Sequence, residues 1–154
     1  MKLLAVALAL LAACRGDRTP PRGELVSEEL LVPLALAKAC HHKSKLLAAQ
    51  GDLAAATAAL RPVLALRFPA SAPEGEDVRL DARARLAELL LAQHASAEAL
   101  RMVTEGLAEA TRESFFVANL YTVEGEVLEA RGERRAANAA YDQSNAVIER
   151  LQRR

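Results

Sequence analysis

Apolar residues recur at helical spacing from about residue 33 to the C-terminus. Side chains three and four positions apart share one face of a helix, so this period predicts amphipathic helices that each bury one face. Short polar or glycine-containing breaks divide the pattern into segments. The predicted helices span about 33–50, 53–67, 78–93, 96–109, 112–131 and 133–153.

Three features set the boundaries in the N-terminal half. Ser27, followed by Glu28 and Glu29, is typical of a helix start, because acids in the first turn interact favourably with the helix dipole. Pro33 then predicts a break or a new start, since the residue before a proline is biased away from the α region. The stretch FPASAPEGED, residues 68–77, is rich in Pro, Gly and Ser and predicts a loop.

Composition favours an all-α fold. The 154 residues are 52% hydrophobic but only 3% aromatic, and alanine and leucine, which are good helix formers, are abundant. Twenty basic and twenty acidic residues give a net charge of zero. The chain therefore carries no overall field that would favour nucleic acid or an anionic membrane, and no nucleic-acid partner is expected.

An uninterrupted apolar run occupies the N-terminus. Leu3 to Ala13, eleven residues, follows Met1 and Lys2. As a helix this run would be about 16 Å long, whereas the hydrocarbon core of a bilayer is about 30 Å thick. The run is too short to span a membrane and matches the apolar region of a signal peptide.

The end of this run, Leu11-Ala12-Ala13-Cys14, resembles the lipobox of bacterial lipoproteins. The resemblance implies that residues 1–13 are a signal peptide removed before Cys14. It also implies that the Cys14 sulfur carries a diacylglycerol and that acyl chains anchor the protein to a membrane. Residues 14–26, which are charged and contain Pro20 and Pro21, then form a flexible tether to a helical domain at 27–154.

Ordinary secretion is the alternative. Cleavage near an Ala-x-Ala site would release an unlipidated periplasmic helical protein, in which a Cys14–Cys40 disulfide could form. With lipid on Cys14, Cys40 would have no partner in the chain and should be buried or inert.

Three segments repeat the order helix, turn, helix. Their turn positions, Gly51, His94 and Gly132, lie 43 and 38 residues apart. Repeats of this length predict stacked helical hairpins, each of which buries its apolar face against the next.

These segments resemble the tetratricopeptide repeat over roughly residues 35–150. The third copy matches best, and an unrelated bundle of alanine-rich hairpins is the alternative. The resemblance implies a short α-solenoid of about three tetratricopeptide-like hairpins. The third copy carries the pattern at Tyr121, Gly125, Leu128, Gly132, Ala137 and Tyr141; the first at Ser44, Leu47, Gly51, Ala56, Leu60 and Val63; the second at Ala87, Leu90, Ala99, Val103 and Leu107.

In this family the first helix of each hairpin lines a concave groove. The resemblance implies a groove that is basic at one end and acidic at the other, and that binds a segment of another protein. The groove positions are Lys38, His41 and Lys45 in the first repeat, Asp81 and Glu88 in the second, and Asn119, Thr122, Glu126 and Glu129 in the third.

Catalytic and metal-binding patterns give no positive prediction. Cys40, His41 and His42 are adjacent, and neighbours on a helix point about 100° apart, so they cannot converge on one ion. The chain has no Gly-x-Ser-x-Gly, Gly-x-Gly-x-x-Gly or phosphate-loop motif. We expect no catalytic residue, cofactor or metal.

The expected function is a membrane-anchored scaffold or assembly factor in the bacterial cell envelope, with another envelope protein as partner. An accessory binding module for a cell-wall polymer or a wall-active enzyme is the alternative. Arg15, with no Asp after the lipid cysteine, favours the periplasmic face of the outer membrane. Val147, Ile148 and Leu151 continue an apolar stripe to the C-terminus, which predicts that a second copy or another chain covers the last helix.

Overall fold

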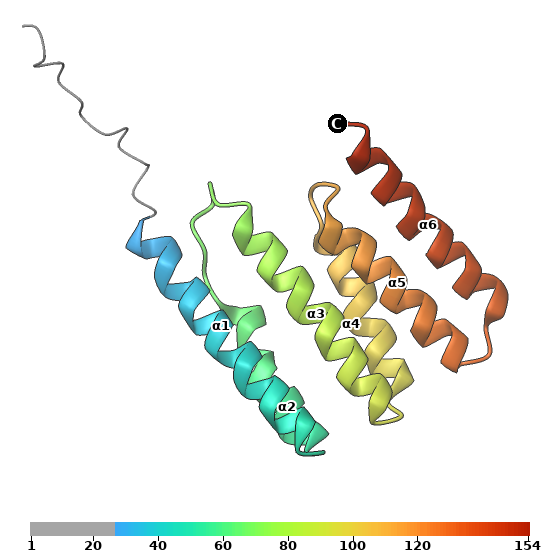
Figure 1. Ribbon diagram of the computed structural model, residues 1–154, viewed down its shortest axis with the longest axis horizontal. Helices are drawn as coiled ribbons and strands as arrows, with labels where there is room; N and C mark the ends of the chain where they lie inside the picture. Colours follow the sequence, from blue (N-terminus) through green and yellow to red (C-terminus); the bar gives the residue numbers. More distant parts are fainter. Residues whose placement is uncertain (1–26) are drawn as a thin grey trace, which may run out of the picture.

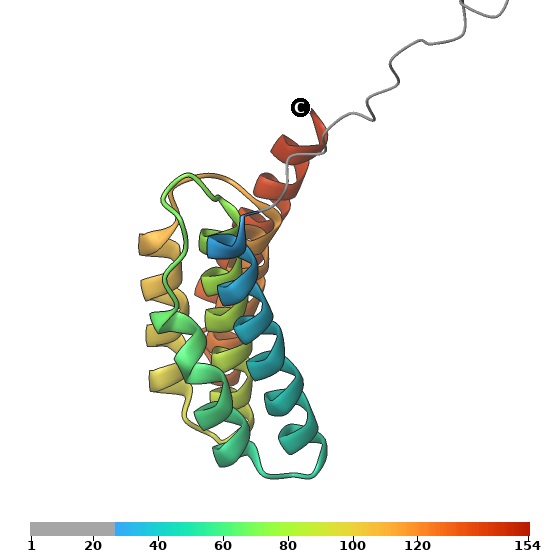
Figure 2. The ribbon, with the colours of Figure 1, turned by 90° about the vertical axis from the view of Figure 1, so that its left-hand side faces the viewer.

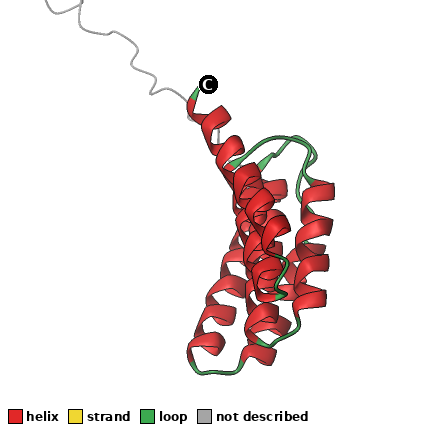
Figure 3. Cartoon of the chain, turned by 90° about the vertical axis from the view of Figure 1, so that its right-hand side faces the viewer, coloured by secondary structure: helices red, strands yellow, loops and turns green. Residues whose placement is uncertain are grey.

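The computed structural model describes residues 27–154. The predicted signal peptide, Cys14 and the predicted tether up to residue 26 lie outside the described residues. The described chain contains helices and loops and no strand (Figure 3), which confirms the all-α prediction. Its elements are α1 (Glu28–Ala49), α2 (Leu53–Leu60), a 3-10 helix η1 (Arg61–Ala65), α3 (Glu74–Ala92), α4 (Ser96–Glu109), α5 (Phe115–Ala130) and α6 (Arg134–Gln152).

The helices form three hairpins, α1/α2, α3/α4 and α5/α6, that lie side by side (Figure 1). The most extensive contacts occur within each hairpin. Each later hairpin also packs on the one before it, since α3 contacts α1, α2 and η1, and α5 contacts α3 and α4. This is the predicted order of stacking, with α1 at one end of the row and α6 at the other.

The three predicted turns share one backbone conformation. Gly51, His94 and Gly132 have φ values of 84°, 61° and 79°, in the left-handed region that closes many helices. After each of them, the next N–H donates to the carbonyl five residues back, as in Asp52 N–H to Leu47 O at 3.0 Å. His94 thus ends α3 as the two glycines end α1 and α5, at the energetic cost of a side chain in that conformation.

The predicted break at Pro33 is wrong. α1 begins at Glu28 and continues through Pro33, whose ring is buried. Pro33 stands near the start of the helix, where the proline removes only the bond that its own N–H would have donated to Glu29. Two bonds to the Ser27 carbonyl, from Leu30 at 2.9 Å and Leu31 at 3.0 Å, already close the first turn.

The predicted loop 68–77 is shorter in the structure. α2 ends at Leu60 and passes into η1, and α3 begins at Glu74 rather than at 78. Pro73 precedes the helix, and Glu74, Glu76 and Asp77 stand in its first turn, where acids stabilise the N-terminus. Sequence composition alone therefore favoured a loop where the charges favour a helix start.

Small side chains hold the hairpins together. Nine of the core residues are alanines that are at most 5% exposed. A Cβ added at Gly125 of α5 would lie 2.6 Å from Cζ of Tyr141 in α6, so only a glycine fits there. A Cβ at Gly106 of α4 would lie 3.0 Å from Cδ of Arg83 and closer still to Leu120 of α5.

One charged side chain lies inside this packing. Arg83 of α3 is 7% exposed, and its guanidinium donates to Glu105 at 2.7 Å and to Glu109 at 2.5 and 3.1 Å. Burial alone would lower the pKa of Arg83, but the hydrogen bonds to Glu109 and Glu105 raise it above its usual value. The buried cation is therefore fully paired, and it joins α3 to α4.

The C-terminal helix buries most of its own apolar stripe. Val147 is 2% exposed and Leu151 packs against the same core, while Ile148 is 36% exposed. Arg150 and Arg154 also donate to Glu113, at 2.6 and 2.9 Å, which ties the end of α6 to the α4–α5 loop. The expectation of an uncovered stripe is thus wrong for Val147, and dimerisation through α6 stays a prediction without that support.

We expect Gly125→Ala to destabilise the fold by about 1–3 kcal/mol, because the added methyl group forces the Tyr141 ring out of its position. Urea unfolding measures this loss. In a Tyr141→Val background the space is open, and the same change should stabilise the helix by up to about 1 kcal/mol, as Gly to Ala does in a free helix. An equal loss in both backgrounds would contradict close packing at this site.

Candidate functional site

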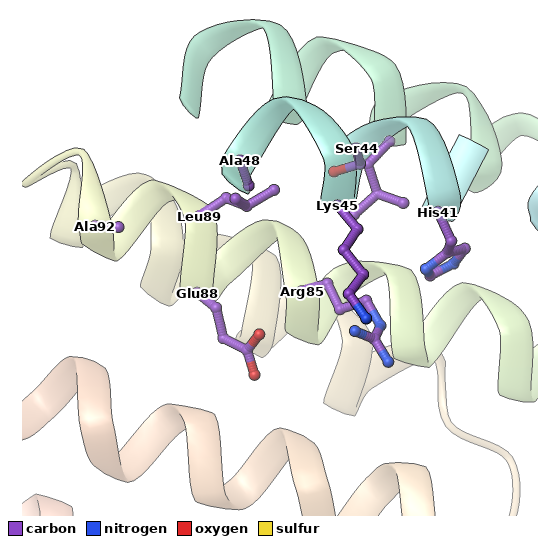
Figure 4. A pocket seen from close by; sticks show the side chains of 9 residues that line it. His41, Ser44, Lys45, Ala48, Arg85, Glu88, Leu89 and Ala92 are labelled. Atoms are coloured by element: carbon purple, nitrogen blue, oxygen red, sulfur yellow. The ribbon is translucent and has the colours of Figure 1, made fainter. Parts of the chain in front are cut away.

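A cleft opens between α1 and α3 on the face formed by the first helices of the hairpins (Figure 4). Its volume is about 240 Å³. The Lys45 and Arg85 side chains extend toward the same opening, and Glu88 projects from α3 toward the next hairpin. The cleft is lined by His41, Ser44, Lys45, Ala48, Leu60, Arg85, Glu88, Leu89 and Ala92.

A wider cleft of about 390 Å³ adjoins the first at His41. Its apolar side chains come from the first helices of all three hairpins, with Phe116 contributed by α5. It is lined by Leu34, Ala37, Lys38, His41, Glu74, Asp77, Val78, Asp81 and Phe116. We call the two clefts together the α1/α3 groove.

The centre of the groove is a paired polar cluster. Arg85 Nε donates to Asp81 Oδ2 at 2.9 Å, and His41 Nδ1 lies 3.7 Å from the same oxygen. Burial lowers the pKa of His41 more than the Asp81 carboxylate raises it. His41 is therefore mostly neutral at neutral pH, and Asp81 has its charge balanced by Arg85.

Several charges around the cluster have no ion-pair partner within residues 27–154. Lys38 and Lys45 are exposed on the α1 side, and Glu88 and Glu126 are exposed on the α3 and α5 side. Partial desolvation by the surrounding residues raises the pKa of Glu88, and the nearby carboxylates Glu126 and Asp81 raise it further against the effect of Arg85. The groove thus offers cations along one wall and carboxylates along the other.

Asp77 lines the wider cleft and joins α3 to the α4–α5 loop. Its Oδ2 accepts from Arg112 at 2.5 Å, whereas its Oδ1 is buried and has no hydrogen-bond partner in the described part of the chain. A buried acceptor without a donor is unfavourable.

Most of the predicted groove residues come together. Lys38, His41, Lys45, Asp81 and Glu88 line the groove. Glu126 of α5 lies close enough to affect the pKa of Glu88. Asn119, also on α5, is partly buried and lines neither cleft.

Two predicted groove residues face α6 instead. Thr122 pairs with the buried Ser144 hydroxyl at 2.9 Å, and Glu129 accepts from the Tyr141 hydroxyl at 3.2 Å. The contact of Gly125 with Tyr141 fixes this orientation, because Thr122, Gly125 and Glu129 share one face of α5. Both residues therefore stabilise the third hairpin.

The sequence reading missed two residues that shape the groove. Arg85 follows Asp81 by four positions, and this spacing predicts a helix-surface ion pair. Phe116 has no such signal, since it reaches the groove only through the stacking of α5 on α3.

The described residues show neither a metal-ion site nor a membrane-spanning helix. No group of three or more His, Cys, Asp and Glu in residues 27–154 is arranged to hold a metal ion. No helix within that range is both long and apolar enough to cross a bilayer.

The comparison with protein families agrees with this architecture. Residues 35–154 match the family model described as a tetratricopeptide repeat-like domain. The chain therefore belongs to the tetratricopeptide repeat-like family, as the sequence predicted. Domains of this family are in general non-catalytic modules that bind other proteins. No curated protein and no solved structure matches the chain.

Stability should depend on pH through Glu88. Its raised pKa means that the folded state holds this proton more tightly than the unfolded state. The resulting stabilisation is present below the ordinary glutamate pKa of 4.5 and is lost as pH rises through the shifted value. We expect Glu88→Gln to be more stable than the wild type at pH 7, and the difference to disappear near pH 4.

Urea unfolding at the two pH values checks this expectation. Glu88→Ala is the matched control, because it removes the charge without adding an amide group and should show the same change with pH. A Glu88→Gln variant that is less stable than the wild type at pH 7 would mean that the carboxylate is favourably paired.

Proposed function

We propose that this protein is a lipid-anchored scaffold or assembly factor of the bacterial cell envelope that binds a segment of another envelope protein in the α1/α3 groove. The observation that carries the proposal is the pair of oppositely charged walls. Lys38 and Lys45 stand on one wall and Glu88 and Glu126 on the other, with no ion-pair partner in residues 27–154.

The floor of the groove suits a peptide. Leu34, Ala37, Val78 and Phe116 provide an apolar surface, while the paired Asp81 and Arg85 side chains provide hydrogen-bonding groups. Apolar pockets with a few polar groups that fix orientation are typical of ligand sites. A bound segment would place acidic side chains along α1 and basic side chains along α3 and α5.

The anchor rests on the N-terminal sequence. The sulfur of Cys14, at the end of the sequence Leu11-Ala12-Ala13-Cys14, would receive the lipid. The tether of about twelve residues would reach at most about 40 Å and would let the domain stand clear of the headgroups. Arg15 favours the outer membrane, on its periplasmic face.

The anchor has a direct test in cells fed with labelled palmitate. We expect the wild type to incorporate label and to require detergent for release from membranes. Cys14→Ser should abolish both properties, because it removes the thiol that accepts the lipid. Cys40→Ser is the matched control and should keep both. Label retained in Cys14→Ser, or a wild-type protein that washes off without detergent, would support the unlipidated secreted form.

The groove is tested by affinity capture from solubilised membranes. Alanine at Lys38, Lys45, Glu88 and Glu126 together should abolish capture of the partner, because it removes both charged walls at unchanged net charge. The control replaces Arg134, Arg135, Asp142 and Glu149 of α6, which are also two cations and two carboxylates and are all exposed.

Loss of a captured protein in the groove variant alone supports the proposal. Equal capture by both variants would show that the partner binds elsewhere. Capture of glycan rather than protein would favour the alternative function, a binding module for a cell-wall polymer.

A further inference from the structure

The outer face of α1 is an apolar surface that no other described element covers. α1 stands at the edge of the row of hairpins, with its outer side open to the viewer in Figure 2. Leu31, Val32, Leu36 and Leu46 are 49%, 58%, 51% and 61% exposed. These are four of the six large exposed hydrophobic side chains in residues 27–154. Patches of this kind on a soluble domain mark interaction sites.

The spacing on this face is that of a coiled-coil seam. Steps of three and four residues connect the positions, which is the repeat that two long helices use when they pack along their length. All members of the seam are exposed. The seam consists of Glu29, Val32, Leu36, Ala39, Lys43 and Leu46.

Charge on the seam is self-complementary. Glu29 and Lys43 lie seven residues before and seven residues after Leu36, which is about 10.5 Å on either side. If two α1 helices cross antiparallel at Leu36, Glu29 of each helix comes opposite Lys43 of the other. A parallel pair would instead oppose like charges. Neither residue has an ion-pair partner within the described part of the chain.

We propose that a second copy of this chain covers the outer face of α1, in an antiparallel pair of α1 helices related by a twofold axis near Leu36. Val32 and Leu36 form the apolar centre, Ala39 allows the backbones to approach, and Glu29 pairs with Lys43 at both ends. Such an interface uses the same patch on both subunits, as twofold dimers do. The grooves stay open, because they lie on the opposite side of α1, along His41 and Lys45.

A bilayer surface fits this face less well. Helices that lie on membranes flank their apolar face with Lys and Arg. Here Glu28 and Glu29 stand at one end of the apolar stripe, where an anionic surface would repel them. A partner helix that carries Lys43 at the matching position accounts for Glu29.

Sedimentation velocity of the full-length protein in a density-matched non-ionic detergent tests the pairing. We expect a concentration-dependent dimer. Leu36→Glu should weaken self-association by about tenfold or more, because it places a charge at the twofold axis of an apolar interface. The matched control is Ile148→Glu on α6, which changes an exposed apolar side chain at the other end and should leave the dimer intact. Circular dichroism confirms that both variants remain helical.

Charge reversal distinguishes pairing from general damage. Glu29→Lys and Lys43→Glu should each weaken the dimer, and the double variant should restore it. The two residues of one chain are about 21 Å apart along α1, so a direct interaction within the chain cannot explain a rescue.

Four results would overturn the proposal. The first is a wild-type protein that stays monomeric at all concentrations, and the second is a dimer that Ile148→Glu disrupts and Leu36→Glu does not. The third is a double charge variant that does not recover self-association. The fourth is a Leu36→Glu variant that loses only its binding to phosphatidylglycerol vesicles. The last of these would assign the face to lipid. None of them bears on the groove, whose capture experiment uses residues that face the other way.

Discussion

Close approach between helices is the constraint on which the rest of this structure depends. With few aromatic residues, the chain cannot fill wide gaps between hairpins, so its helices must pack at short distance through alanine and glycine. Gly125 against Tyr141 sets the third hairpin, and Gly106 against Arg83 and Leu120 sets the contact of the second hairpin with α5. Each contact also fixes the rotation of a helix about its axis, and thereby which side chains reach the groove.

The groove follows from that geometry. Each later hairpin packs on the one before it through its own first helix, α3 or α5, so the first helices line a common face. α1 and α3 make few direct contacts, because η1 and α2 occupy much of the space next to α3. The clefts at His41 open where the two helices do not touch. At the centre of the groove Arg85 pairs with Asp81, so the carboxylate there has a cation beside it.

The sequence predicted structure correctly where a residue type and its neighbours favour one local conformation. The order helix, turn, helix predicted turns at Gly51, His94 and Gly132, and all three have the left-handed conformation. Sequence reasoning failed at Pro33, because the penalty for proline depends on its distance from the start of the helix. It also misplaced Thr122, because the rotation of α5 depends on its contact with α6, which no local pattern encodes.

The two ends of the row differ in a way that bears on assembly. A stacked repeat needs a polar outer face at each end to remain soluble on its own. α6 meets this requirement, since it turns Val147 inward and presents mainly polar residues outward. α1 does not, since Val32 and Leu36 are exposed and no other helix of residues 27–154 covers them. The row of hairpins is therefore asymmetric, with a polar outer face on α6 and an apolar outer face on α1. Association through α1 buries that apolar face and leaves the groove free.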